Sequence, residues 1–256
     1  MLQGVGAYGA SGWNPQIDIL QNHYTCLTLD NRGVGASQPP AVERLTVEQM
    51  AADSLALMDH MGWESAHIVG HSLGGLIALQ MALTAKSRVR SLALLCTFAR
   101  GADANRWEPA LLWIALRLRF GPRFLRRRAF MELVLPPEQR KTDTSEVAAR
   151  LSRVFGHDIA DVPSFSGQQL AAMRHHDISS RLGELSGIPT LVVSGEKDLI
   201  ARPQFGRAIV AGITSARYVE FSGAGHALPV LQAERCADVL LEHLADSEMS
   251  KPSAYK

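Results

Sequence analysis

The sequence predicts an α/β fold, in which a mostly parallel β-sheet is flanked by helices and carries a helical cap. Short apolar segments with strand character alternate with longer segments of helical periodicity, a pattern typical of parallel sheets covered on both faces. One long stretch, residues 98–181, interrupts this alternation and contains only helical segments. The length of 256 residues suits a single α/β domain with one insertion.

The expected strands are short apolar runs bounded by turn-forming residues. We expect them at residues 24–30, 66–70, 91–96, 190–194 and 217–221. Longer segments have helical periodicity, and we expect helices at residues 46–61, 73–85 and 233–245. In the first of these helices, Val47, Met50 and Met58 are spaced to form one apolar stripe, which predicts a helix packed against a core.

The interrupting stretch predicts a separate layer of helices. We expect these helices at residues 109–120, 123–135, 145–155 and 168–176. Pro136, Pro137 and Gly156 punctuate the stretch, because proline and glycine break helices. The expected organisation is a core of residues 1–97 and 182–246, a cap of residues 98–181 at one edge of the sheet, and a disordered tail of residues 247–256.

The composition indicates a globular protein without a polyanionic partner. Hydrophobic residues make up 46% of the chain, charged residues 20%, and the net charge is +1. We therefore expect no nucleic-acid partner and no membrane partner; nothing indicates an oligomeric state. The three cysteines are expected as free thiols, which favours a reducing compartment. The sequence shows neither a signal peptide nor the run of about 18 apolar residues that a membrane span needs. We therefore expect a cytoplasmic location.

The strongest motif is Gly70-His71-Ser72-Leu73-Gly74, a G-x-S-x-G sequence. It lies between an apolar strand and an apolar helix, the setting of a nucleophile elbow. In such a turn the glycines avoid collisions, and the N–H of Leu73 points at an oxyanion from the positive end of the helix. The motif predicts Ser72 as a nucleophile; the alternative is a glycine-rich turn that only connects strand and helix.

A serine nucleophile requires a base and an acid that orients it. His226 follows a predicted strand in a loop of small residues and is the best candidate for the base. Asp198 follows another strand, and sites in open α/β sheets form at the carboxyl ends of strands. We expect Asp198 to orient His226. Glu196, in the same loop, is the competing acid.

Four motifs together carry a resemblance to a known family: DNRGVGAS at residues 30–37, GHSLGG at 70–75, GEKD at 195–198 and GAGH at 223–226. They resemble the α/β-hydrolase superfamily, in particular small bacterial 3-oxoadipate enol-lactonases and haloperoxidase-type esterases. The resemblance implies hydrolysis of a small carboxylic ester or lactone through an acyl-enzyme, without a cofactor or a metal. Alternatives are C–C bond or thioester hydrolysis, or a non-catalytic ligand-binding or interaction protein with the same fold.

The resemblance also implies a second oxyanion donor near the start of the chain. The family's loop usually begins with histidine, and the matching residues here are Gln3, Gly4, Val5 and Gly6. The backbone N–H of Val5 is the expected donor, because donation requires no particular side chain. The family has two strands and most of a third before this loop. We therefore expect the N-terminal strands to be missing and the start to be truncated or misassigned.

Several other residues have structural interpretations that we prefer. His71 is expected to pack beside the site, and His175 and His176 to end a helix, because adjacent helical side chains diverge too far to share a metal. A group of cap arginines is expected to form a solvated face, with attraction of an anionic substrate as the alternative; it comprises residues 117, 119, 123, 126, 127 and 128. Apolar cap residues are expected mainly to pack on the core, with one or two lining a pocket: Trp107, Leu111, Leu112, Trp113 and Phe120.

Overall fold

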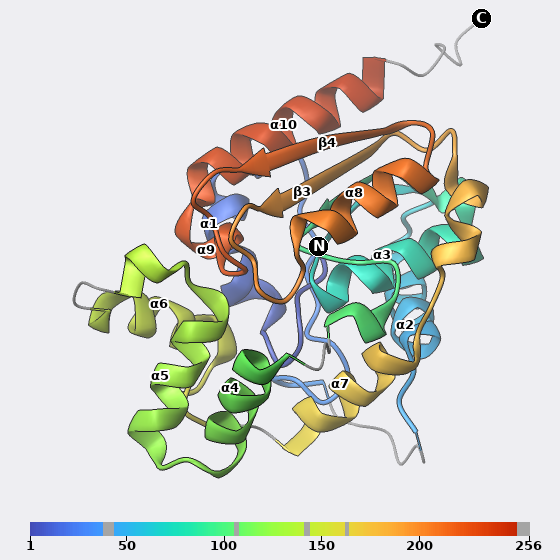
Figure 1. Cartoon of the computed structure of the whole chain (residues 1–256). Helices are drawn as coiled ribbons and strands as arrows, with labels where there is room; N and C mark the ends of the chain where they lie inside the picture. Colours follow the sequence, from blue (N-terminus) through green and yellow to red (C-terminus); the bar gives the residue numbers. More distant parts are fainter. Residues whose placement is uncertain (38–43, 105–107, 141–143, 162–163, 250–256) are drawn as a thin grey trace, which may run out of the picture.

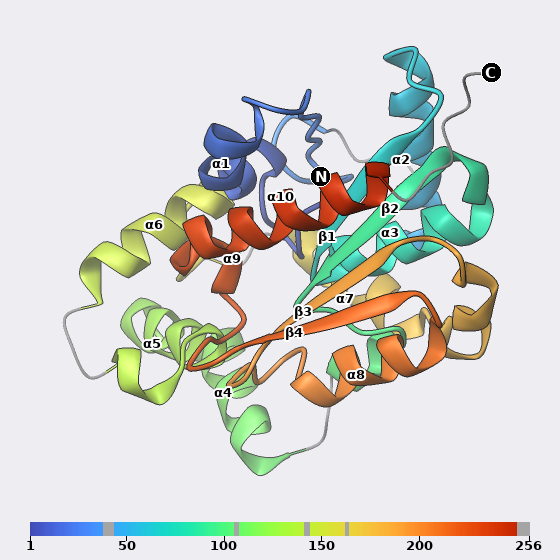
Figure 2. The ribbon, with the colours of Figure 1, turned by 90° about the horizontal axis from the view of Figure 1, so that it is seen from above.

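The computed structural model describes residues 1–37, 44–104, 108–140, 144–161 and 164–249. Four parallel strands form one sheet in the order β1-β2-β3-β4, and they comprise β1 (Ala66–His71), β2 (Val89–Leu95), β3 (Thr190–Gly195) and β4 (Ala216–Phe221). The strands point in one direction, so their carboxyl ends meet at one edge (Figure 2). The predicted α/β class is confirmed.

Helices cover both faces of this sheet. On one face, α10 (Ala233–Met249) contacts β2 and packs against α1 (Gly9–Leu20). On the other face, α3 (Leu73–Thr84) lies over β1 and β2, and α8 (Pro203–Gly212) lies over β3 and β4. Outside α3 lies α2 (Val47–His60). Figure 1 shows α10 and α8 on opposite sides of the strands, so the sheet is buried from both directions.

The predicted helical cap consists of four helices: α4 (Pro109–Phe120), α5 (Arg123–Val134), α6 (Ser145–Phe155) and α7 (Ser164–His175). Its own apolar cluster includes Val134 and Leu151, which pack with Ala227 and Val230 from the segment that follows β4. The N–H of Ala227 donates a hydrogen bond of 3.2 Å to the carbonyl of Val134. The cap therefore lies over the carboxyl ends of the strands, as Figure 2 also shows, and not simply beside an outer strand.

Local sequence accounts for the main helices. Thr46 and Gln49 form a reciprocal capping box at the start of α2, with hydrogen bonds of 3.2 and 3.0 Å. Almost every residue of α3 is apolar and buried, as expected for a helix enclosed on all sides. Short helical turns complete the chain: α9 (Leu228–Leu231) and 3-10 segments at Lys86–Arg88, Gly101–Ala104, Pro137–Arg140 and Ser179–Leu185.

Within the described ranges, no helix has the length and apolarity needed to cross a membrane.

Two expectations about elements were wrong, and one helix was not predicted. Residues 24–30 form no strand, because in the described chain their backbone pairs with no neighbouring strand; the carbonyl of Leu27 accepts instead from the amino nitrogen of Met1 at 2.7 Å. Helix α1 was not expected, since it contains two glycines and Pro15. Helix α10 continues to Met249, so the tail does not begin at Ser247, which is buried and donates to the carbonyl of His243 at 2.6 Å. Residues 250–256 lie outside the described part of the chain.

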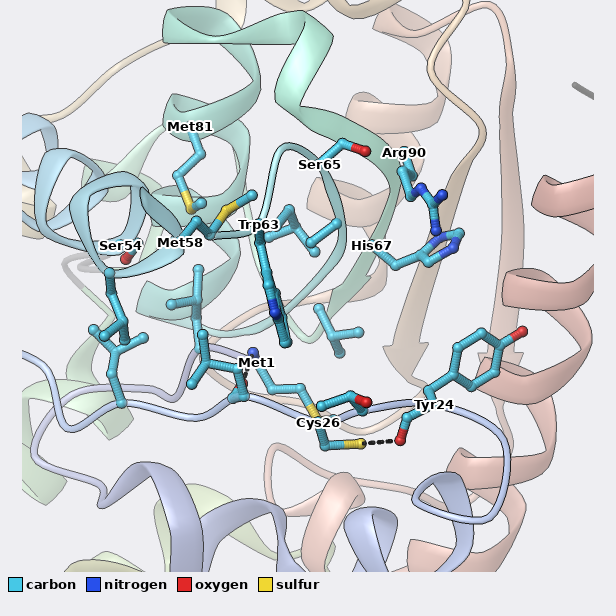
Figure 3. Close-up of a pocket in the computed structure, with 18 of the residues that line it drawn as sticks. Met1, Tyr24, Cys26, Ser54, Met58, Trp63, Ser65, His67, Met81 and Arg90 are labelled. Atoms are coloured by element: carbon cyan, nitrogen blue, oxygen red, sulfur yellow. Dashed lines mark hydrogen bonds between the residues drawn. The ribbon is translucent and has the colours of Figure 1, made fainter. Parts of the chain in front are cut away.

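The outer edge of β1 makes contact with the start of the chain. The N–H of Leu2 donates to the carbonyl of Val69 at 2.8 Å, and the N–H of His71 donates to the carbonyl of Leu2 at 3.0 Å. Beyond this bridge lies a largely apolar cavity of about 360 Å³, around which Figure 3 shows Met1, Met58 and Trp63. This cavity is lined by different residues from the one that contains Ser72.

Candidate active site

Ser72 lies at the sharp turn between β1 and α3. Its φ of 54° and ψ of −119° place it in a strained region for a residue with a side chain. The backbone is held there because the N–H of Ser72 donates to Leu95 at 3.0 Å and the hydroxyl of Thr97 donates to the carbonyl of Ser72 at 2.7 Å. A Cβ at Gly70 would collide with the carbonyl of Gly74, so the glycine is required by close backbone approach.

His226 and Asp198 form a buried pair. Nδ1 of His226 lies 2.8 Å from Oδ2 of Asp198, and both side chains are almost fully enclosed. The other carboxylate oxygen of Asp198 accepts hydrogen bonds from the N–H groups of Ile200 and Ala201, at 2.8 and 2.9 Å. Burial raises the pKa of Asp198, but the charge and hydrogen bond of His226 and these backbone donors outweigh it and lower the pKa. An ionised Asp198 places the proton on Nδ1 and leaves Nε2 as the basic nitrogen.

The competing acid, Glu196, has its hydrogen-bond partners in the turn after β4. Its Oε2 accepts hydrogen bonds from the hydroxyl of Ser222 at 2.9 Å and the N–H of Gly223 at 2.7 Å. Glu196 is exposed and stabilises the turn after β4. Of the two candidate acids in this loop, it is therefore Asp198 that contacts His226.

Ser72 and His226 line the same cavity, which has a volume of about 470 Å³. Across the residues that the structure covers, the hydroxyl of Ser72 accepts or donates no hydrogen bond to protein, so it can rotate toward a base or a ligand. Catalytic hydrogen bonds are commonly loose in structures without substrate and tighten when substrate binds. The arrangement is chemically competent for nucleophilic attack by Ser72 with proton transfer to His226.

The loop from Gln3 to Gly6 lies directly against Ser72. A Cβ at Gly4 would lie 3.2 Å from the Cβ of Ser72. The side chain of Gln3 accepts from the N–H of Gly4 at 3.2 Å, and Gln169 of α7 accepts from the N–H of Gly6 at 2.8 Å. These bonds fix the backbone on either side of Val5.

Two backbone donors remain available at the elbow and its neighbouring loop. In the part of the chain that the structure describes, the N–H groups of Val5 and Leu73 have no protein acceptor. Leu73 is the first residue of α3, where an N–H has no partner within the helix. The two N–H groups predicted from the sequence are therefore free to donate to a ligand, which is one requirement of an oxyanion hole.

His71 packs beside the pair, as the sequence predicted. Its ring lies 4.9 Å from that of His226, with Nε2 3.1 Å from the carbonyl of His226 and Nδ1 3.3 Å from Oε1 of Gln3. Burial, followed by the charge of His226, lowers the pKa of His71 to about 3. His71 is therefore neutral at ordinary pH and adds no charge to the site.

Cys96 is the other nucleophilic side chain near Asp198. Burial, reinforced by the negative charge of Asp198, raises the pKa of the Cys96 thiol well above its usual value. A thiol that stays protonated is a poor nucleophile, so Ser72 is the better candidate. All three cysteines are free.

Among the described residues, the group whose ligand atoms are close enough for a metal is His71, Cys96 and His226, and it coincides with this site.

The histidine pair at the end of α7 behaves as expected for a helix terminus. His175 is exposed, whereas His176 is buried with Nδ1 3.1 Å from Oε1 of Glu48. The two histidines therefore do not share a ligand.

The cavity above Ser72 is lined mainly by apolar side chains of the cap. They include Phe130, Leu133, Val134, Leu151, Val154, Phe155 and Ile159. Of the cap residues named from the sequence, Leu112, Trp113 and Phe120 are exposed and absent from the lining. Leu111 is also absent from it, and Trp107 lies outside the described residues. Periodicity located the helices but not which face turns toward the cavity.

The cap arginines are mostly paired with acids. Four of them pair with acids: Arg117 and Arg128 with Glu132, Arg127 with Asp158, and Arg123 with both Asp158 and Asp161. Arg119 is exposed and lines the cavity.

Gln169 was not predicted from the sequence. Its side chain accepts from the N–H of Gly6 and donates to the carbonyl of Arg32 at 3.0 Å. It gives no local signal, because its partner lies far away along the chain.

Comparison with known proteins agrees with this geometry. A family model described as the alpha/beta hydrolase fold matches residues 1–232. A protein of Agrobacterium fabrum, provisionally named carbamate hydrolase RutD, is 28% identical, with 97% of this chain and 92% of that protein aligned. The enol-lactonase of Burkholderia xenovorans LB400 is similar in structure, with a TM-score of 0.77, 27% identity, and 95% and 90% of the two chains covered. A thermophilic esterase of Thermogutta terrifontis has a TM-score of 0.77 and 25% identity over 96% and 88%.

Proposed function

Since the chain belongs to the α/β-hydrolase fold family and is a hydrolase of that fold, we propose that it cleaves a carboxylic ester or lactone through an acyl-enzyme on Ser72. The observation that carries this proposal is the buried pair of His226 and Asp198, whose side chains lie 2.8 Å apart. His226 lines the same cavity as Ser72, which lies on a strained strand–helix turn.

We also propose a cytoplasmic location, supported by the three free thiols.

The reaction proceeds in two steps. His226 takes the proton of Ser72 through Nε2 as the serine oxygen attacks the carbonyl carbon, and Asp198 stabilises the resulting imidazolium. The N–H groups of Val5 and Leu73 hold the oxyanion. The alcohol or enol leaves with the proton from His226. Water, activated by the same histidine, then releases the acid and restores the serine.

The cavity favours a substrate with an apolar group of moderate size. A volume of about 470 Å³ lies within the range typical of small-molecule sites, and its walls are largely aliphatic and aromatic. An ester or lactone presents one polar carbonyl to the oxyanion donors and leaves its carbon chains to these walls. The enol-lactonase and the esterase with similar structures support these two bond types.

A carbamate is the second candidate, favoured by the name of the relative from Agrobacterium fabrum. The same attack on a carbonyl carbon cleaves a carbamate ester. A small charged carbamate, however, leaves most of the apolar cavity unfilled, whereas an ester with an apolar chain fills it. Thioester and C–C bond hydrolysis, and ligand binding without catalysis, have no observation here that favours them over ester cleavage.

The test begins with intact mass after incubation with an alkyl fluorophosphonate. We expect one adduct on the wild-type chain and none on Ser72→Ala, because only an activated serine reacts. Matched esters, lactones and carbamates then follow, and Ser72→Ala should reduce turnover by about 10⁴–10⁶-fold. A wild-type chain that is folded by circular dichroism but takes no adduct contradicts the proposal and favours the non-catalytic alternative.

A further inference from the structure

Large apolar side chains are exposed mainly on one part of the molecule. Among the described residues, eight large hydrophobic side chains are exposed. Five of them belong to the paired helices α4 and α5, namely Leu112, Trp113, Leu116, Phe120 and Phe124. Phe120 is 75% exposed and Phe124 69%. We call these five residues the apolar face of the cap. Contiguous exposed apolar side chains commonly mark an interaction surface.

The apolar face has the geometry of a helix that lies on a surface. At about 100° per residue, Leu112, Trp113, Leu116 and Phe120 fall within about 100° of one another around α4. Arg117 and Arg119 lie on the two flanks of this stripe, with their guanidinium groups 5.8 Å from the ring of Trp113 and 5.2 Å from the ring of Phe120. Exposed aromatic and leucine side chains beside arginine combine an apolar contact with positive charge, the two attractions that hold a protein at an anionic lipid interface.

The entrance to the active-site cavity lies beside this face. Of the residues that line the cavity, the exposed ones are Ala115, Arg119, Leu170 and Arg174. They belong to α4 and α7, which lie on neighbouring sides of the cap in Figure 1. Arg119 both borders the apolar face and lines the cavity, so the entrance and the face are continuous.

The charge of this region identifies the kind of partner. Helices α4 and α5 carry six arginines and one acid, Glu132. Asp158 and Asp161 are the further acidic partners of these arginines, so positive charge remains in excess. A second copy of the chain docked face to face would bring two such regions together, which like-charge repulsion opposes. An anionic lipid surface attracts this excess positive charge and accepts the apolar side chains at the same time.

We propose that the apolar face of the cap docks on an anionic lipid surface and places the cavity entrance at that surface. An apolar ester dissolved in the lipid can then enter the cavity without crossing water. The docking does not depend on catalysis; only this delivery of substrate rests on the proposed function. The proposal departs from the expectation of no membrane partner, which relied on net charge and on long apolar runs. Neither quantity detects exposed apolar side chains that are concentrated on two paired helices of the cap.

The test is co-sedimentation of the full chain with vesicles of phosphatidylcholine alone and of phosphatidylcholine with phosphatidylglycerol. We expect binding to the anionic vesicles that weakens as salt is added. The double variant Trp113→Ser with Phe120→Ser should bind at least about tenfold more weakly, since each loses a large apolar contact. Met61→Ser is the matched control, because Met61 is 47% exposed and lies outside this face.

Two further measurements separate this proposal from its rivals. Ser72→Ala should bind the anionic vesicles as tightly as the wild type does, because docking does not require catalysis. Vesicle binding therefore tests docking even if the proposed hydrolase activity is not found. Hydrolysis of a water-soluble ester by the double variant should match wild type, because neither replaced residue lines the cavity. Absence of wild-type binding to anionic vesicles, or equal binding by the double variant, overturns the proposal. Light scattering that shows a dimer dissociated by the double variant assigns the face to a second copy and also overturns it.

Discussion

Replacement of Gly74 by alanine tests how closely the start of the chain supports the elbow. A Cβ at position 74 would overlap the carbonyl oxygen of Leu2, and a normal contact requires the two atoms to separate by roughly 1 Å. Leu2 is held by hydrogen bonds to Val69 and His71 of 2.8 and 3.0 Å. It also immediately precedes the loop that carries the N–H of Val5. The variant therefore moves a proposed oxyanion donor without removing any catalytic side chain.

The expected magnitude follows from these contacts. Weakening two backbone hydrogen bonds costs about 2 kcal/mol of stability. Displacement of one oxyanion donor costs about 10²–10³-fold in kcat. The assay is kcat and KM on a nitrophenyl ester, together with urea unfolding. Gly183→Ala is the control, because a Cβ at Gly183 meets no atom within 4 Å and should leave both quantities nearly unchanged. A folded Gly74→Ala protein with wild-type kcat refutes the assignment of this loop to the oxyanion hole.

Three further predictions concern the acid, the cavity and a buried histidine. Asp198→Asn should reduce kcat by about 10⁴-fold and Glu196→Gln by less than about threefold, because Asp198 alone of the two contacts the base; equal losses would contradict this. Leu133→Trp should narrow the cavity and lower kcat/KM for long-chain esters more than for acetates, and an equal loss on both would count against the cavity as the acyl site. Burial lowers the pKa of His243 to about 4 from 6.5, so protonation favours the unfolded chain between these pH values. Between pH 6.5 and pH 4 the free energy of unfolding of the wild type should therefore fall by up to about 3 kcal/mol more than that of His243→Gln, as measured by urea unfolding. Parallel pH profiles of the two proteins would contradict this prediction.

The elements that the sequence located are those whose signal is local. Residues 109–120 and 145–155 end at proline, glycine or a change of periodicity, and both helices have these bounds in the structure. Helix α1 was missed because Gly9, Gly12 and Pro15 oppose helix formation in isolation. It is stabilised by burial of Trp13 and Leu20 and by contact with α10, which no local pattern contains.

The candidate site divides in the same way. Ser72, Asp198 and His226 each sit in a short motif at the end of a strand, which is a local signal. The structure places Ser72 and His226 in one cavity and Asp198 in contact with His226. Their catalytic roles remain the proposal made above. The apolar lining was not predictable, because Leu133 and Phe155 differ from other cap residues only in the direction that they face. That direction depends on how four helices pack, and helical periodicity alone does not determine it.

The cavity described above is built from two parts of the chain with separate duties. Its floor, with Ser72 and His226, comes from loops of the sheet, and most of its roof comes from the inserted helices. Replacement of Leu133 or Phe130 in the roof leaves the proposed nucleophile and base in place. A protein assembled in this way can evolve a new substrate preference through its insertion alone, while the proposed catalytic residues beneath stay unchanged.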